Sequence, residues 1–175
     1  GILHNAILIV VATPIFTIDF IIRIIDNYWY TTTLTNIRVI DNDRIVFIEF
    51  EKKGFKYVAG QYAFINIPKI GLLEWHPFTL SCYPGQNNNK LSMHIKVEGN
   101  WTSKLSIWMK SIQNQPEFWK HTRINIEGPH GELMLPKPLH KYQHILFISG
   151  GIGITPCESL FNQLVSDLVY NKQLK

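Results

Sequence analysis

The 175-residue sequence predicts a mainly β fold followed by the start of an α/β domain, on three observations. Short runs rich in β-branched and aromatic residues alternate with glycine turns, which is typical of a small antiparallel barrel or sandwich. An uncharged apolar run opens the chain. A strand, a glycine turn and a helix start close it, which is the first half of a βαβ unit. Because the chain begins with Gly1 and ends within a predicted helix, we expect a fragment of a longer protein.

The opening run, from Gly1 to Ile18, is dominated by Ile, Leu, Val and Ala. A helix that crosses a membrane needs about 20 apolar residues, so this run is a candidate for the end of such a helix. The aromatic residues Tyr28, Trp29 and Tyr30 follow, as is typical of a membrane–water interface. The alternative is an amphipathic helix buried in the core. The run lacks the basic start and the cleavage site of a signal peptide.

The middle of the chain alternates between polar and apolar residues, as strands with one buried face do. We predict strands at Thr31–Ile40, Arg44–Glu51, Tyr62–Ile67, Phe78–Ser81, Leu91–Val97, Thr122–Glu127 and His144–Ser149. Helices are predicted at Thr102–Lys110 and from Pro156 onward. The polar run Gln86–Asn89 is a predicted hairpin loop, and Pro136 and Pro138 mark a predicted linker.

Charge and cysteine content exclude several classes of protein. The net charge is +4 and the basic residues are scattered, whereas nucleic-acid binding needs a concentrated basic stripe. The two cysteines, Cys82 and Cys157, stand in unrelated contexts without metal-ligand spacing. We therefore expect no nucleic-acid partner, no metal site and no disulfide framework, and we infer a reducing compartment.

The glycine turn near the C-terminal end is the first candidate site. Its sequence runs Gly150-Gly151-Ile152-Gly153-Ile154-Thr155-Pro156, and proline is well placed in the first turn of a helix. Glycines let the backbone approach a ligand closely, and a helix N-terminus offers free N–H groups to phosphate. The spacing departs from the six-residue dinucleotide fingerprint. The alternative is a purely structural turn.

Two further candidates lie on the predicted strands. The run Trp75–Ser81 places an aromatic ring and hydroxyls on a strand held extended by Pro77, which would seat a flat heteroaromatic ring. The run Gly99–Ser103 opens a helix, with Thr102 and Ser103 at cap positions, after a strand that carries His94 and Lys96, which makes a second anion site. The alternatives are a buried strand with a proline bend and an ordinary capped helix.

Seven motifs follow one another in a fixed order. They are Lys53-Gly54-Phe55-Lys56, Gly60-Gln61-Tyr62-Ala63-Phe64, Leu73-Glu74-Trp75-His76-Pro77-Phe78-Thr79-Leu80, His94-Ile95-Lys96, Gly99-Asn100-Trp101-Thr102, Gly128-Pro129-His130-Gly131 and the glycine turn. In this combination the chain resembles the dehydrogenase region of the NADPH oxidase and ferric reductase superfamily. The resemblance implies a ferredoxin-reductase-like FAD-binding antiparallel β-barrel at residues 31–138. A transmembrane helix end with its linker would precede it at 1–30, and a truncated NADPH-binding domain would follow at 139–175.

The resemblance also implies which residues bind the cofactors. The FAD-binding residues would be His76, Pro77, Phe78, Thr79 and Ser81 on one strand, and His94, Lys96, Trp101, Thr102 and Ser103 around the second anion site. Those for NADPH would be Gly150, Gly151, Gly153, Thr155 and Pro156. The family usually has Arg where this chain has Lys96, so a bidentate phosphate contact becomes a point charge. It often has Asp where this chain has Asn100. No general acid or base is expected, because the cofactors carry the chemistry.

The activity implied by the resemblance is electron transfer from NADPH through FAD to haem and on to molecular oxygen, giving superoxide or hydrogen peroxide. The haem would lie in the transmembrane part of the same protein, and His4 is expected to make a polar contact and not to bind it. We expect a multi-pass membrane protein with cytosolic FAD and NADPH domains, lipid contacts and possible regulatory subunits. The alternatives are a ferric-chelate reductase, a non-catalytic FAD-binding regulatory module and a soluble ferredoxin-reductase-like enzyme. The apolar opening argues against the last.

Overall fold

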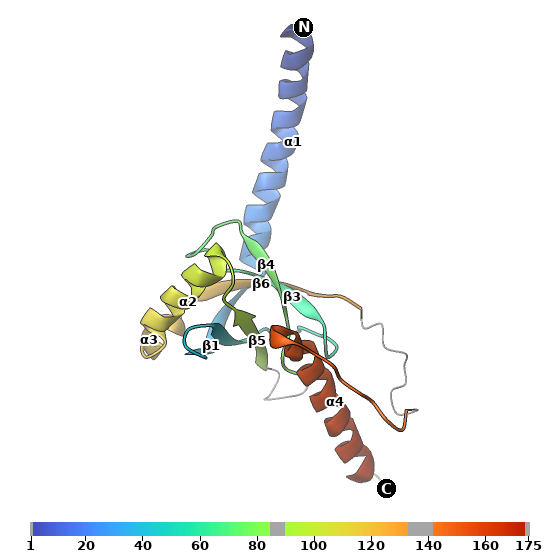
Figure 1. Cartoon of the computed structure of the whole chain (residues 1–175). Coiled ribbons are helices and arrows are strands. Elements are labelled where there is room, and N and C mark those ends of the chain that lie inside the picture. Colours follow the sequence, from blue (N-terminus) through green and yellow to red (C-terminus); the bar gives the residue numbers. More distant parts are fainter. Residues whose placement is uncertain (1, 85–89, 133–141, 174–175) are drawn as a thin grey trace.

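The computed structural model describes residues 2–84, 90–132 and 142–173 (Figure 1). Its helices and strands, in chain order, are α1 (Ile2–Trp29), β1 (Thr31–Ile40), β2 (Ile45–Glu51), β3 (Tyr62–Asn66), β4 (Trp75–Thr79), β5 (Lys90–Lys96), α2 (Asn100–Ile112), α3 (Pro116–Trp119), β6 (Arg123–His130), the short 3-10 helix η3 (Gly151–Gly153) and α4 (Ile154–Gln173). The predicted loop Gln86–Asn89 and the linker prolines Pro136 and Pro138 lie outside the described residues.

The six strands form one antiparallel sheet in the order β4-β3-β6-β1-β2-β5. Its two ends meet, because Leu80 forms a bridge with Met93 and the Ser81 N–H donates to the Ser92 carbonyl at 2.9 Å. The sheet therefore closes into a barrel, as the sequence predicted. This closure brings the residues after β4 beside β5.

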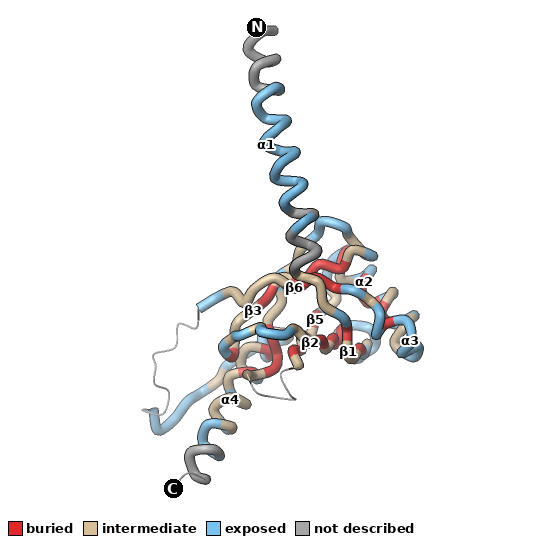
Figure 2. The backbone as a smooth tube through the Cα atoms, turned by 180° about the vertical axis from the view of Figure 1, so that it is seen from behind, coloured by how far each residue is buried: buried red, intermediate tan, exposed pale blue. Residues whose placement is uncertain are grey.

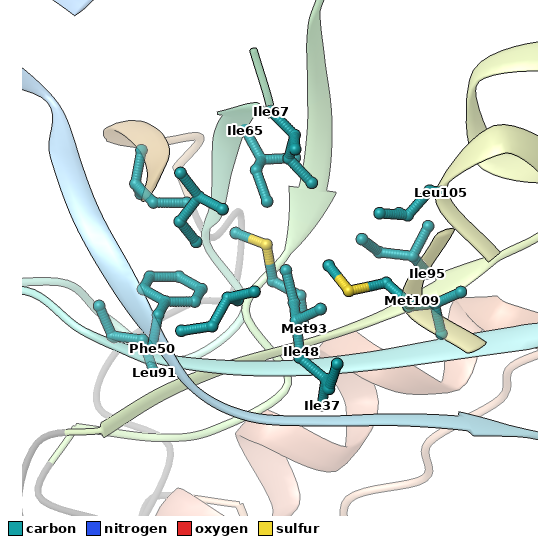
Figure 3. Packing of buried hydrophobic residues seen from close by; sticks show 14 of the residues in the cluster. Ile37, Ile48, Phe50, Ile65, Ile67, Leu91, Met93, Ile95, Leu105 and Met109 are labelled. Carbon is teal, nitrogen blue, oxygen red and sulfur yellow. The ribbon is translucent and has the colours of Figure 1, made fainter. Parts of the chain in front are cut away.

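The barrel core follows from strict alternation along β5, whose inward residues pack with Ile48 and Phe50 of β2 (Figure 3). On β5, Leu91, Met93 and Ile95 are at most 1% exposed, while the residues between them face outward. Leu105 and Met109 of α2 are fully buried and extend the same core, since α2 packs against β1 and β2. These buried residues fix which face of α2 packs against the barrel and therefore where its N-terminus lies.

The β1–β2 turn holds α2 in place. Asp41, Asn42 and Asp43 all adopt positive φ angles of 55°, 52° and 67°, a region that Asn and Asp tolerate better than most residues. The Ser106 hydroxyl of α2 donates to the Asp43 carbonyl at 3.1 Å, and Lys110 forms an ion pair with the Asp43 carboxylate. These contacts tie the helix to the edge of the barrel.

Helix α1 extends away from the barrel and continues well past the apolar run Gly1–Ile18 (Figures 1 and 2). Its described side chains are exposed, with Phe16 at 70% and Ile25 at 52%, so the alternative of a helix buried in the core does not hold. Over the residues that are described, no helix combines the length and apolarity needed to cross a membrane. The side chains of His4, Tyr28 and Trp29 lie outside the described residues.

Three predicted strands differ from the structure. The strand predicted at Thr122–Glu127 is β6, which continues to His130. The strand predicted at Phe78–Ser81 is β4, which starts three residues earlier and ends at Thr79; Pro77 is accommodated because β4 stands first in the sheet order, where a missing N–H costs little. The segment His144–Ser149 is not a strand. A strand needs a neighbour to hydrogen-bond with, and within the described part of the chain none lies beside it.

Candidate functional site

Two rings of β4 meet the start of α2 on the inner face of the strand. His76 and Phe78 are two residues apart and so share a face. The His76 ring lies 4.3 Å from the Trp101 ring, centroid to centroid, and the Phe78 ring stacks 6.1 Å from it at an interplanar angle of 25°. Trp101 is 6% exposed. Two residues predicted from one motif are thereby brought to Trp101, the second residue of α2, which was predicted from another motif.

This ring cluster (His76, Phe78 and Trp101) leaves polar groups unpaired. Nε2 of His76 and Nε1 of Trp101 are buried and form no hydrogen bond within the described part of the chain. The nearest carboxylate oxygen to the histidine, Oε2 of Glu74, is 3.8 Å away. A buried polar group without a partner costs about 1–3 kcal/mol. A bound molecule would remove this cost if it offered an acceptor to the indole N–H and, according to the histidine tautomer, a donor or an acceptor to Nε2.

The other predicted residues of β4 lie elsewhere. Thr79 is directly opposite Tyr62 of β3, and Pro77 is directly opposite Phe64, so both face away from the ring cluster. Tyr62 and Phe64 surround His130, with ring centroids 5.7 Å and 5.3 Å from it. The motif Gly128-Pro129-His130-Gly131 marks this second group of rings in the sequence, but the sequence alone predicted no role for it.

The start of α2 is capped differently from the prediction, which placed Thr102 and Ser103 at the cap. The N-cap is Gly99, and Thr102 is the third residue of the helix. Its Oγ1 accepts hydrogen bonds from the N–H groups of Gly99 at 2.9 Å and Glu98 at 3.0 Å, so the hydroxyl is already engaged. The Ser103 N–H donates to the Gly99 carbonyl. What the helix offers an anion is therefore its first backbone N–H groups and not a side-chain hydroxyl.

The outer face of β5 carries His94 and Lys96 on one side, as predicted. The His94 Nδ1 lies 2.9 Å from Oγ of Ser81, which in turn is 3.2 Å from Oγ of Ser92. Ser81 is only 4% exposed, so its place is behind the histidine and not on the open face of β4. The Lys96 ammonium forms an ion pair with Glu98.

Burial lowers the pKa of His94, and the guanidinium of Arg38 lowers it further, against an opposing effect of Glu158. The ring is therefore held toward its neutral form. It packs 4.9 Å from the Phe47 ring, whose other neighbour is the Arg38 guanidinium at 4.9 Å. His94 thus serves as a hydrogen-bonding group, and Lys96, with Lys90 and Arg38, supplies positive charge on this face.

The glycine turn lies against β5, because η3 contacts that strand. Gly151 has a φ angle of 54°, which favours glycine, and a Cβ atom built on Gly150, Gly151 or Gly153 would meet nothing within 4 Å. The turn therefore borders open space, as a backbone that approaches a ligand should. The Thr155 hydroxyl donates to the Ile152 carbonyl at 3.0 Å and is buried, so it holds the turn's shape. Pro156 lies in the first turn of α4.

Known proteins resemble most of this chain in sequence. A family model described as an FAD-binding domain matches residues 29–134. The heavy chain of a superoxide-generating NADPH oxidase from Dictyostelium discoideum is 34% identical over 144 residues, covering 77% of this chain and 26% of that protein. NADPH oxidase 1 of Mus musculus is 32% identical over 126 residues, covering 72% and 20%. The chain thus spans about a quarter or less of these relatives' lengths.

Solved structures resemble about three quarters of this chain. A ferredoxin-NADP+ reductase from Plasmodium falciparum is 22% identical with a TM-score of 0.58, covering 77% of this chain and 51% of that one. A cytochrome P450 reductase from Amycolatopsis is 19% identical with a TM-score of 0.60, covering 78% and 38%. At these identities the likeness concerns the fold, and it confirms the ferredoxin-reductase-like architecture.

Proposed function

This chain belongs to the FAD-binding domain family of the NADPH oxidases and ferric reductases, and on that premise we propose that it is the flavin-binding part of a membrane flavocytochrome. The protein would pass electrons from NADPH through FAD to haem and on to molecular oxygen. The observation that carries the proposal is the ring cluster, where two buried ring nitrogens at the start of a helix have no hydrogen-bond partner among the described residues.

The residues present fit FAD. The Trp101 ring lies against His76 and stacks with Phe78, so a flat ring system bound beside this cluster would meet aromatic side chains and the two unpaired ring nitrogens. The N-terminus of α2 lies at the same place and offers backbone N–H groups to phosphate. Lys96 adds a cation once it leaves Glu98, and an exposed ion pair of this kind contributes only about 0–1 kcal/mol. FAD, when bound, supplies the redox chemistry by accepting a hydride and releasing single electrons.

The nicotinamide cofactor would lie at the glycine turn. The open space beside Gly150, Gly151 and Gly153 admits a phosphate close to the backbone, and α4 directs its N-terminus toward it. Because η3 contacts β5, this site would adjoin the outer face that carries Lys96. The chain's own part in the reaction is to orient the two cofactors and to exclude water from the space between them.

We also propose a multi-pass membrane protein whose flavin and nicotinamide parts face the cytosol. Support comes from α1, which exposes apolar side chains such as Val10 and Ile15 along its described length and needs apolar surroundings. The remaining haem-bearing helices of the same protein, together with lipid, would supply them. Regulatory subunits on the cytosolic side are the last part of this proposal.

The experiment is to purify the full-length protein and identify the flavin that it releases, by mass spectrometry. We expect FAD, because the backbone N–H groups at the start of α2, together with Lys96, suit a pyrophosphate. Dominant FMN would contradict the proposal. NADPH oxidation is then followed with either oxygen or a ferric chelate as acceptor. Superoxide formed in the first case supports an oxidase, whereas turnover with the chelate alone would identify a ferric-chelate reductase.

A further inference from the structure

Ser159 links α4 directly to the barrel. It lies one helical turn after Thr155 and is fully buried. Its hydroxyl accepts a hydrogen bond from the Gly60 N–H at 3.3 Å and donates one to the Cys82 carbonyl at 2.5 Å. These partners are 99 and 77 positions away in the sequence, so the contact is a tertiary one.

The two partners of Ser159 belong to one corner of the barrel. Gly60 precedes β3 and Cys82 follows β4, and the Leu80 N–H donates to the Gln61 carbonyl at 3.0 Å between them. Gly60 has a φ angle of 87°, so this corner has a backbone conformation that side-chain-bearing residues rarely adopt. A single hydroxyl therefore joins the ends of two neighbouring strands to α4.

This corner is itself firmly held. The thiol of Cys82 accepts hydrogen bonds from the Tyr57 hydroxyl at 3.0 Å and from the Ser92 N–H at 3.2 Å. Burial, followed by the hydrogen bond to Cys82, raises the pKa of Tyr57, which keeps its hydroxyl protonated as a donor. The carbonyl that Ser159 contacts is thus fixed to β5 as well as to β4.

The rest of α4 shows that the attachment is local. Farther along the helix, Phe161, Val165 and Leu168 are 54%, 42% and 59% exposed. The position of the glycine turn relative to β4 is therefore decided near the N-terminus of α4, where Ser159 lies. Since β4 carries His76 and Phe78, the same contact relates the nucleotide turn to the ring cluster.

We propose that Ser159 is a positioning residue that holds the glycine turn in register with the ring cluster for hydride transfer. The inference rests on the proposed function. In that reaction NADPH gives up a hydride, which is one proton with two electrons, and becomes NADP+; FAD takes up the hydride and a solvent proton and becomes fully reduced. Hydride transfer is sensitive to the separation of the two rings, and a displacement of about 1 Å can cost about a hundredfold in rate.

The test uses the full-length protein with FAD bound and three variants. Ser159→Ala removes the hydroxyl, Ser159→Thr keeps it, and Ser166→Ala is a matched control two turns along the same helix. The rate of flavin reduction by saturating NADPH is measured without oxygen, together with FAD affinity. We expect Ser159→Ala to slow reduction about tenfold or more. FAD affinity and reduction by dithionite should stay unchanged, because neither depends on the nucleotide turn. Ser159→Thr should restore the rate, and Ser166→Ala should match the wild type.

A second readout needs no turnover. Loss of the Ser159 hydroxyl removes the acceptor of the Gly60 N–H, so hydrogen exchange at Gly60 should become faster in Ser159→Ala and not in Ser166→Ala. Equal reduction rates in wild type and Ser159→Ala would overturn the inference, and so would loss of FAD, since that would place Ser159 in barrel stability. A wild type that binds FAD but does not accept electrons from NADPH would overturn the proposed function instead, and exchange at Gly60 would still report on the contact.

Discussion

The barrel and the segment at residues 142–173 differ in how far their apolar side chains are buried. In the barrel, inward residues such as Ile48 and Leu91 are at most 1% exposed, whereas Leu146 and Ile148 of the later segment are 84% and 83% exposed. The difference shows where the folding free energy of this chain resides. Apolar burial orders the barrel, whereas a few specific contacts, with Ser159 at their centre, place the glycine turn.

The largest expected effect is the difference in unfolding free energy between the same Leu→Ala substitution made in each region. Leu91→Ala leaves a cavity in the barrel core and should lower the free energy of unfolding by about 2–5 kcal/mol. Leu146→Ala removes the same atoms from an exposed position and should change it by less than about 0.5 kcal/mol. Chemical denaturation of this 175-residue chain measures both. Similar losses at the two positions would mean that Leu146 is covered in the native protein.

A buried amide pair, second in expected effect, stabilises the barrel beside α1. The Asn125 amide donates to Oδ1 of Asn66 at 2.8 Å, and the Thr31 hydroxyl donates to Oδ1 of Asn125 at the same distance. Asn125→Ala leaves a buried acceptor without its donor, which should cost about 1–3 kcal/mol of stability. Asn114→Ala, at an exposed position, is the control and should be close to neutral. A neutral Asn125→Ala would show that water replaces the lost amide.

The contrast between the buried barrel and the exposed later segment also explains which elements could be predicted from the sequence. Alternation and turn residues located the barrel strands, because burial of one face imposes a period of two. Alternation could not show that His144–Ser149 lacks a partner strand among the described residues, since pairing depends on a neighbour and not on the segment itself. The short helix α3, which starts at Pro116, was also not predicted, being only four residues long.

The sequence predicted part of which side chains lie together and less of their geometry, while their role in binding stays a prediction. The sequence located both the strand that carries His76 and Phe78 and the start of the helix that carries Trp101. In the structure these three side chains do come together. The N-cap was misplaced, since glycine caps a helix through its backbone and leaves no side-chain signal, and the Thr102 hydroxyl was assumed to be available. Ser159 carries no sequence signal of its role, because both its partners are distant along the chain.

Lys96 lies on β5, the strand that η3 contacts, and substitutions there test whether this face binds the FAD phosphates. A charge-assisted hydrogen bond contributes roughly 1.5–3 kcal/mol, so Lys96→Ala should weaken FAD binding about tenfold to a hundredfold. Lys96→Arg should keep or improve binding, because a guanidinium grips two phosphate oxygens. Glu98→Gln frees the ammonium from its ion pair and should strengthen binding by no more than about fivefold. Flavin titration by fluorescence quenching measures all three. Equal affinity for wild type and Lys96→Ala would remove Lys96 from the site.

The smallest expected effect is the pH dependence contributed by His94, which also lies at this junction. Burial and Arg38 lower its pKa in the folded protein, and Glu158 of α4 opposes them. The folded protein therefore takes up this proton less readily than the unfolded chain does. The stability that His94 contributes is fully present above the unfolded pKa of about 6.5 and is lost as the pH falls through the lower folded value.

Denaturation curves recorded from about pH 8 down to about pH 5 reveal this contribution. In the wild type the free energy of unfolding should fall as the medium is acidified, and His94→Gln should flatten part of that fall, because glutamine does not titrate. His121→Gln, at an exposed position outside the junction, should leave the slope as it is. Glu158→Gln sharpens the comparison of the two regions: with the opposing carboxylate gone, the folded pKa of His94 should drop further and the acid-induced loss should grow. If Glu158→Gln leaves the pH profile unchanged while His94→Gln flattens it, the Glu158 carboxylate does not lie near His94 in solution. The placement of α4 relative to the barrel would then be wrong.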